Sequence, residues 1–158
     1  MKKLSLLCIA LLLFCVSTLS CGESENPISC ENINGIAIDS FEDLFFEDVT
    51  CFIQNINPDQ GTVNLVIKTQ SDYEKYFACN PMVPQIDFEK YFILAGRYRH
   101  RQCAIWDSQQ VLDCQKRIIF KVNMLEQDCL AFTNVYYFTV LEKKYSNWPI
   151  EFDVRFIN

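Results

Sequence analysis

The sequence predicts a small α+β domain in which antiparallel β-structure predominates, folded as a sandwich or a partly open barrel with one or two short helices. Three observations support this prediction. Several segments alternate apolar and polar residues and are separated by turn residues. One segment begins with a helix-capping pattern, and six cysteines downstream of the N-terminal segment predict disulfide bonds. Residues 35–158 show no internal repeat or second linker, so we expect them to form a single domain.

Five segments show strand patterns. The first follows residues 57–61 (Asn-Pro-Asp-Gln-Gly), which have turn chemistry because proline fixes φ and glycine permits positive φ. The apolar run at 91–96 is short enough for a strand that is covered on both faces. Residues 135–141 carry aromatic side chains on both faces, so we expect a central strand there. Alternation of apolar and polar residues predicts half-buried strands at 62–68, 117–123 and 150–156.

A short helix is predicted between the first two of these strands. Ser71 and Glu74 have the spacing of a capping box, with Ser71 as the N-cap residue. A helix from 71 to 78 would present an aromatic face to the sheet. This face would consist of Tyr73, Tyr76 and Phe77.

The first 20 residues have the composition of an export signal. Two lysines precede 16 uncharged, mainly apolar residues, 4–19, a marginal length against the about 20 residues that span a bilayer. Thr18-Leu19-Ser20-Cys21 resembles the lipobox of bacterial lipoproteins, whose cysteine is acylated and becomes the mature N-terminus. We therefore expect residues 1–20 to be a lipoprotein signal peptide and Cys21 to be the lipidation site. Ordinary secretion and an uncleaved anchor are the alternatives.

Residues 21–34 are polar and without periodicity, which predicts an acidic tether between the lipid and the domain. Glu23 and Glu25 resemble the surface-export signals of Bacteroides-type lipoproteins. We expect an outer-membrane lipoprotein on the periplasmic or the surface face. Two or more acyl chains would hold it there, whereas one chain binds a membrane only reversibly.

The charge balance restricts the partners. Removal of residues 1–20 takes away two lysines and no acid, which leaves 12 basic and 20 acidic side chains and a formal charge of −8. An acidic chain lacks the basic footprint expected of a nucleic-acid-binding protein. Electrostatic attraction to anionic lipid is weak as well, so the lipid must provide the anchor. We expect the membrane and an unknown envelope protein or glycan as partners, and no cofactor.

Six cysteines remain for disulfide pairing if residues 1–20 are removed and Cys21 is acylated. An even number in an oxidising compartment predicts three bridges, among 15 possible pairings. If 107–110 forms a tight turn, Cys103 and Cys114 face each other across a hairpin and pair. The six are Cys30, Cys51, Cys79, Cys103, Cys114 and Cys129.

From Ser71 onward the chain resembles a family of uncharacterised Bacteroides-type lipoproteins. The resemblance rests on SDYEKYFAC (71–79) and QIDFEKYFILAG (85–96), followed by the hairpin and strands up to residue 157. More distantly, the order of elements is similar to the C-terminal domain of PrcB-like protease-complex accessory subunits. The resemblance implies a small α+β domain with a mainly antiparallel sheet and carries over no catalytic residue. The Gly-rich segment of the PrcB-like pattern is replaced here by Arg-Tyr-Arg-His-Arg (97–101).

Several sequence patterns bear on catalysis or metal binding. His100, Cys103 and Cys114 have ligand-like spacing, but arginines flank the single histidine and a structural zinc site needs four ligands. Cysteine–histidine catalysis requires a free, activated thiol, which disulfide pairing removes. No Gly-x-Ser-x-Gly motif is present for serine hydrolysis. The acidic pairs Glu42/Asp43 and Glu47/Asp48 permit acid–base chemistry, although such pairs also mark a solvated face or a helix start.

The basic segment 97–101 is the binding feature that the sequence singles out. Its residues are Arg97, Tyr98, Arg99, His100 and Arg101. Arginine binds carboxylate and phosphate groups through two parallel hydrogen bonds, so this segment is a candidate contact site for an anionic glycan, phosphate or acidic protein surface. The alternative is a strand end whose cations balance nearby acids. Trp106 and Trp148 are further candidates.

The sequence therefore favours a non-enzymatic envelope lipoprotein that acts as a binding or accessory module. One alternative is a small envelope hydrolase with a carboxylate site. Another is a protease-inhibitor-like or protease-accessory module, which the distant resemblance suggests.

Overall fold

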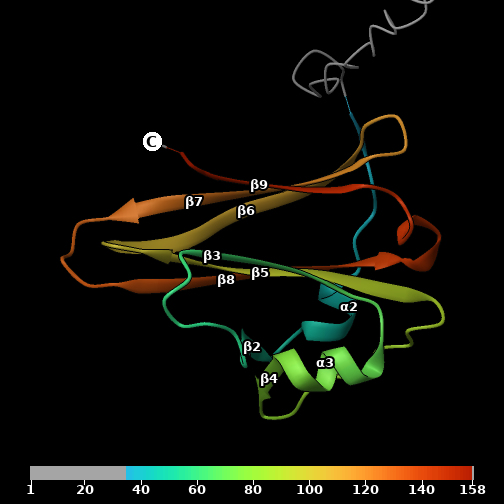
Figure 1. Cartoon of the computed structure of the whole chain (residues 1–158), viewed down its shortest axis with the longest axis horizontal. Helices are drawn as coiled ribbons and strands as arrows, with labels where there is room; N and C mark the ends of the chain where they lie inside the picture. Colours follow the sequence, from blue (N-terminus) through green and yellow to red (C-terminus); the bar gives the residue numbers. More distant parts are fainter. Residues whose placement is uncertain (1–34, 158) are drawn as a thin grey trace, which may run out of the picture.

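The computed structural model describes residues 35–157, so the predicted signal peptide and tether, with Cys21 and Cys30, lie outside the described residues. The described part forms three layers (Figure 1). Two are the sheets β1-β6-β7-β9 and β3-β5-β8, and the third holds two short helices and the two-stranded sheet β2-β4. In chain order the elements are β1 (Ile36–Ala37), α2 (Glu42–Phe46), β2 (Thr50–Ile53), β3 (Thr62–Ile67), α3 (Gln70–Tyr76), β4 (Phe77–Asn80), β5 (Tyr91–His100), β6 (Cys103–Asp113), β7 (Ile118–Gln127), β8 (Thr133–Glu142), η2 (Lys143–Tyr145) and β9 (Ile150–Phe156).

The predicted fold class is confirmed. Adjacent strands pair antiparallel, except that β7 and β9 are parallel. The sheets stack as a sandwich and do not close into a barrel within residues 35–157. The three half-buried strands predicted from alternation correspond to β3, β7 and β9.

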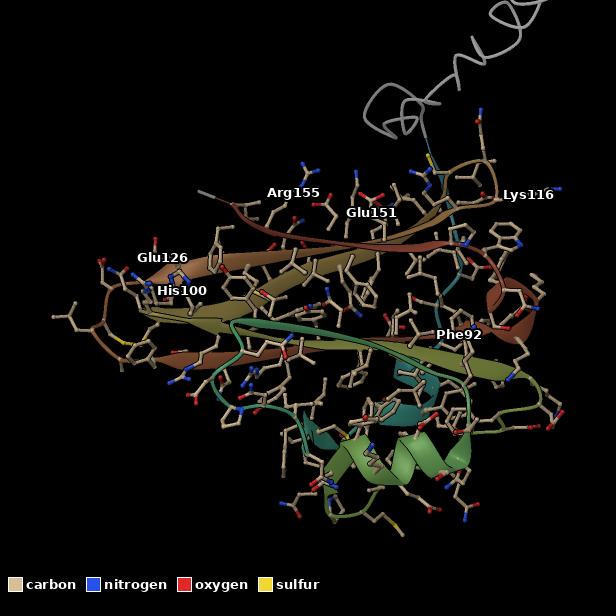
Figure 2. All side chains as sticks on the ribbon, in the orientation of Figure 1. Phe92, His100, Lys116, Glu126, Glu151 and Arg155 are labelled. Carbon is tan, nitrogen blue, oxygen red and sulfur yellow. A yellow bond between two sulfur atoms is a disulfide. The ribbon has the colours of Figure 1, made fainter. Side chains whose placement is uncertain are left out.

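Two apolar cores lie on opposite faces of β5. Phe92 points between the two large sheets (Figure 2). It belongs to one core cluster with Leu94 of β5 and with Phe120 and Val122 of β7. Ile93 and Ala95 point to the other face, toward the layer that contains α3. Residues 92–97 of β5 are all buried, which confirms that this strand is covered on both faces.

The strand at 135–141 is not central, contrary to the prediction. It forms part of β8, which lies at the edge of the sheet β3-β5-β8. Aromatic residues on both faces show that layers cover both faces of a strand. They do not show that it has a hydrogen-bonded strand on each edge. Within residues 35–157, one edge of β8 therefore has no neighbouring strand.

The helix begins two residues earlier than its capping pattern predicts. Thr69, not Ser71, is the N-cap: its Oγ1 accepts a hydrogen bond from the Asp72 backbone N–H at 3.1 Å. The same hydroxyl donates to the Asp72 carboxylate at 2.8 Å, so Thr69 and Asp72 provide a competing cap. Tyr73 and Phe77 are buried as predicted, although Phe77 already belongs to β4.

The hairpin predicted at 107–110 is wrong, and so is the Cys103–Cys114 disulfide. Residues 107–110 lie within β6, and the chain reverses instead after Cys114, where Gln115 and Lys116 adopt positive φ. Cys103 is the first residue of β6 and Cys114 follows its last residue, so the two are roughly 35 Å apart at about 3.3 Å per residue. Asp107 has turn chemistry, but it is the additional residue of a β-bulge between Trp106 and Ser108.

Two disulfides join the described strands. Cys51 and Cys79 face each other on β2 and β4, with their Cα atoms 4.1 Å apart. Cys103 at the start of β6 pairs with Cys129 beyond β7, with a Cα separation of 5.3 Å. Cys114 is disulfide-bonded as well, and its partner lies outside the described residues.

Candidate functional site

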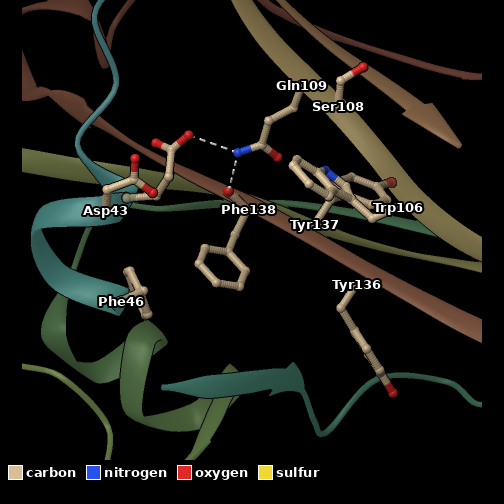
Figure 3. A pocket seen from close by; sticks show the side chains of 9 residues that line it. Asp43, Phe46, Trp106, Ser108, Gln109, Tyr136, Tyr137 and Phe138 are labelled. Carbon is tan, nitrogen blue, oxygen red and sulfur yellow. Dashed lines mark hydrogen bonds between the residues drawn. The ribbon is translucent and has the colours of Figure 1, made fainter. Parts of the chain in front are cut away.

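A hollow of about 450 Å³ lies between the start of α2, the middle of β6 and the free edge of β8 (Figure 3). Its wall combines two carboxylates with aromatic rings and an amide. The lining residues are Glu42, Asp43, Phe46, Trp106, Ser108, Gln109, Tyr136, Tyr137 and Phe138.

The hollow exists because two strand edges remain apart. β8 ends one sheet. Among the described residues, the outer edge of β6 is covered at its C-terminal end, where β1 pairs with Leu112 and Asp113 and the Ile38 N–H donates to the Val111 carbonyl. The bulge between Trp106 and Ser108 bends β6 just where the hollow opens. Trp106 consequently remains 47% exposed in the wall, which is unusual for so large an apolar side chain.

Glu42 is held in place by neutral donors only. Its Oε1 accepts hydrogen bonds from Gln109 Nε2 at 2.9 Å and from Ser40 Oγ at 3.1 Å. Its Oε2 accepts from the buried Thr139 Oγ1 at 2.9 Å. Neither Glu42 nor its exposed neighbour Asp43 forms an ion pair within residues 35–157. The hollow therefore presents negative charge that no described cation neutralises.

Gln109 joins the two sides of the hollow. Besides binding Glu42, its Nε2 donates to the backbone carbonyl of Phe138 at 2.9 Å. Figure 3 shows this amide between the carboxylate and β8. One side chain thus fixes the carboxylate and the distance between β6 and β8 at this point.

The aromatic part of the wall is rigidly packed. The rings of Phe46 and Phe138 are 4.6 Å apart between centroids. Tyr137 lies across β5 at Gly96, where any side chain would collide with the tyrosine ring, and its hydroxyl donates to Asn64 Oδ1 at 2.6 Å. Burial raises the pKa of Tyr137 well above its ordinary value, so the hydroxyl stays protonated and remains a donor.

The basic segment 97–101 is not part of this hollow. Arg97 is buried, and its guanidinium nitrogens donate to the carbonyls of Asn57, Pro58 and Gln60 in the turn before β3. Arg99 donates to the Pro58 carbonyl at 2.8 Å and pairs with the Asp59 carboxylate at 3.2 Å. Both arginines therefore hold the 57–60 turn.

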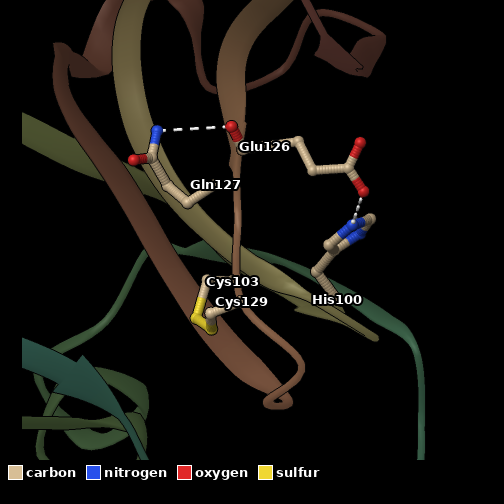
Figure 4. Close-up of a disulfide and its surroundings, with 5 residues drawn as sticks. All are labelled: His100, Cys103, Glu126, Gln127 and Cys129. Carbon is tan, nitrogen blue, oxygen red and sulfur yellow. Dashed lines mark hydrogen bonds and ion pairs between the residues drawn. A yellow bond between two sulfur atoms is a disulfide. The ribbon is translucent and has the colours of Figure 1, made fainter.

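Strand alternation sends Tyr98 and His100 to the opposite face. Both pack on Phe156, the His100 ring at 4.4 Å between centroids. His100 Nε2 lies 2.9 Å from a Glu126 carboxylate oxygen, close to the Cys103–Cys129 disulfide (Figure 4). A smaller hollow of about 360 Å³ here is lined by residues 98–102 and Glu126. Arg101 is exposed. The five residues of the predicted patch thus divide between two faces.

The other sequence candidates lie apart from the hollow. His100, Cys103 and Cys114 do not converge, because the two cysteines are at opposite ends of β6 and both are disulfide-bonded. Glu47 and Asp48 follow α2 and are exposed. Trp148 packs on Tyr145, with ring centroids 5.0 Å apart.

Sequence reasoning found part of the site. Trp106 and the acidic pair Glu42/Asp43 were candidates, but nothing in the sequence connected them. The sequence did not identify Gln109, Tyr136 or Thr139 as site residues. A polar residue in a strand is expected to face solvent unless it is known which other strand lies beside it. These residues meet where β6 lies beside β8, and the contacting residues Gln109 and Phe138 are 29 positions apart in the sequence.

No protein-family model, curated protein or solved structure matches this chain. Within residues 35–157, no helix has the length and apolar character needed to cross a membrane.

Proposed function

We propose that this protein is a non-enzymatic binding module of the bacterial envelope, held at a membrane by lipid on Cys21, and that the hollow between α2, β6 and β8 is its binding site. One observation carries the proposal. The hollow has an open, aromatic wall and a carboxylate that is fixed in place without a cation. A concave, largely apolar site with a few oriented polar groups is typical of ligand binding.

The fixed geometry of Glu42 supports a binding role. An exposed glutamate loses side-chain entropy when a ligand orders it. Here Gln109, Ser40 and Thr139 already hold the carboxylate in place. The half-exposed Trp106 ring adds a large apolar contact surface, and tryptophan is enriched among residues that dominate interface energetics.

The proposed anchor leaves this site accessible. The described chain begins beside the end of β6, where Ile36 is opposite Asp113. The 14 residues from 21 to 34 could extend by about 46 Å if fully stretched. Replacement of Cys21 by serine should move the protein from the membrane fraction to the soluble fraction. Intact mass should show acyl groups on the wild-type protein, and a mature chain that begins at Cys21 without them would refute the anchor.

The binding site can be tested by site-specific photocrosslinking in the native host. A photoreactive phenylalanine analogue replaces Leu44, which is 69% exposed on α2 between the lining residues Asp43 and Phe46. The matched control is Met82, which is 71% exposed in the segment after β4 and does not line the hollow. We expect a discrete crosslinked product from position 44 and only background from position 82. Equal products from both positions would contradict the proposed site.

A further inference from the structure

The free edge of β8 has backbone groups available for another strand. Tyr137 is opposite Gly96 on β5, and alternate residues of β8 point their N–H and C=O groups outward. The outward direction of the even-numbered residues is fixed by two contacts. The Phe138 carbonyl accepts from Gln109 and the Val140 carbonyl accepts from the Phe41 N–H at 3.0 Å.

These two contacts cover only one part of the edge. For the outward N–H and C=O of Tyr136 and the outward N–H of Phe138, the described residues supply no hydrogen-bond partner. Tyr136, Tyr137 and Phe138 also line the hollow, so the uncovered edge opens into it.

This part of β8 lacks the usual protection of a sheet edge. Natural proteins block strand addition with charged side chains, proline or bulges. Residues 134–138 (Asn-Val-Tyr-Tyr-Phe) contain no charge and no proline, and they are in regular register with β5. β9, which ends the other sheet, carries Glu151, Asp153 and Arg155.

The charge of the hollow indicates which peptide fits this edge. Glu42 and Asp43 carry no described counter-ion, so a lysine or arginine of an added strand would supply the absent positive charge. Its alkyl stem can cover the rings of Trp106 and Tyr136, because long cationic side chains pack their methylenes on apolar surface. A cation near an exposed tryptophan face gains further attraction.

We propose that the hollow binds an extended peptide of a partner protein. The peptide adds as a strand to the β8 edge at Tyr136–Phe138 and places a lysine or arginine side chain against Glu42 and Asp43. This proposal specifies the partner of the binding site proposed above and rests on it.

The test uses full-length protein in detergent and a bead-bound library of random heptapeptides. Bound peptides should be enriched about ten-fold in lysine or arginine at one position, since one charge-assisted contact is worth about 1.4 kcal/mol or more. The E42Q/D43N double variant should lose this enrichment. The matched control E47Q/D48N, which removes two exposed carboxylates outside the hollow, should retain it.

Synthetic versions of one selected peptide separate the two parts of the proposal. Replacement of its basic residue by norleucine, or N-methylation of alternate backbone amides, should each weaken binding about ten-fold. Pentylammonium at the same concentration should not displace the peptide.

Displacement by pentylammonium would show a site for small organic cations and would overturn strand addition. Enrichment of no peptide, or of acidic peptides, would also overturn it. A crosslinked product from position 44 would leave the proposed binding site intact in each of these cases.

Discussion

The basic end of β5 and the acidic hollow beside β8 carry opposite charges, and the protein uses those charges differently. At the basic end, Arg97 and Arg99 bind the 57–60 turn, and His100 contacts Glu126. In the hollow, every described donor to Glu42 is neutral. Most of the positive charge serves the fold, whereas the negative charge remains available to a ligand.

This difference teaches that a charged run in a sequence does not by itself identify a binding surface. The five residues 97–101 look like one basic site when they are read in order. In the strand they alternate between two faces, and burial commits Arg97 to backbone carbonyls. An alanine variant of Arg97, Arg99 and Arg101 together would therefore disturb the 57–60 turn. Arg101→Ala alone would test the exposed surface.

The largest effect should come from the disulfide that fastens the basic end. Its cysteines, 103 and 129, are 26 residues apart, so serine at both positions should lower the free energy of unfolding by about 3.5 kcal/mol in the chain-entropy account. Urea denaturation measures this loss. The Cys51/Cys79 double serine variant, with a separation of 28 residues, should show nearly the same loss. A loss below about 1 kcal/mol at positions 103 and 129 would show that the bridge does not constrain the unfolded chain as this account requires.

Arg97 provides the second test. Arg97→Met keeps the apolar stem but removes three charge-assisted hydrogen bonds to the 57–60 turn. We expect the free energy of unfolding to fall by about 3 kcal/mol, because the lost hydrogen bonds are only partly offset by no longer burying a charge. The control Arg101→Met, at an exposed position, should change stability by less than about 0.5 kcal/mol. Equal effects from the two variants in urea denaturation would remove the contrast between a structural arginine and a surface arginine.

Short-range patterns of apolar and polar residues predicted most of the strands, but they did not predict which strands pair with each other. Alternation identified the strands that became β3, β7 and β9. The apolar residues of β3 and β7 are mostly buried, and those of β9 are partly buried against the core between the two large sheets. Burial of β5 on both faces followed from its continuous apolar run. The edge position of β8 and the parallel pairing of β9 could not be predicted, because they depend on how the chain crosses between layers.

The hollow could not be predicted from the sequence either, because it also depends on which strands lie side by side. Its carboxylates come from the start of α2, its amide from β6 and its free backbone from β8. Only the juxtaposition of two strand edges gives these residues a common role. Asp107 has the chemistry of a turn residue, but in the structure it forms a bulge in the strand that carries Trp106.

Alkaline pH should destabilise the protein through two buried tyrosines, of which Tyr137 lines the hollow and Tyr73 does not. Burial raises the pKa of Tyr73 and Tyr137 above the ordinary value of 10.0. The folded protein thus retains two protons that the unfolded chain releases, and stability is full below pH 10 and falls as the pH rises above it. Each tyrosine should contribute a slope of about 1.4 kcal/mol per pH unit.

In the Tyr137→Phe variant, stability should fall less steeply with pH, by about 1.4 kcal/mol per pH unit, because one of the two tyrosine hydroxyls is removed. Urea denaturation between pH 9 and 12 measures this slope. It also loses the hydrogen bond to Asn64, which should lower stability at pH 7 by about 1 kcal/mol. Tyr73→Phe removes a buried hydroxyl that has no partner among the described residues, so it should change the same slope without that loss at pH 7. Unchanged slopes in both variants would show that other groups dominate alkaline unfolding.

The smallest effect is expected at the contact between His100 and Glu126. The Glu126 side chain is half exposed, and solvent screens such pairs, so Glu126→Gln should lower stability by only about 0.5 kcal/mol. The stacking of His100 on Phe156 should hold the ring in place without the carboxylate. NMR spectra of the variant should therefore show a shifted His100 signal and unchanged Phe156 contacts. A loss of stability above about 2 kcal/mol would mean that the His100–Glu126 pair, like Arg97, is needed to hold the fold. Arg101 would then be the one residue of the segment 97–101 whose charge is available at the surface.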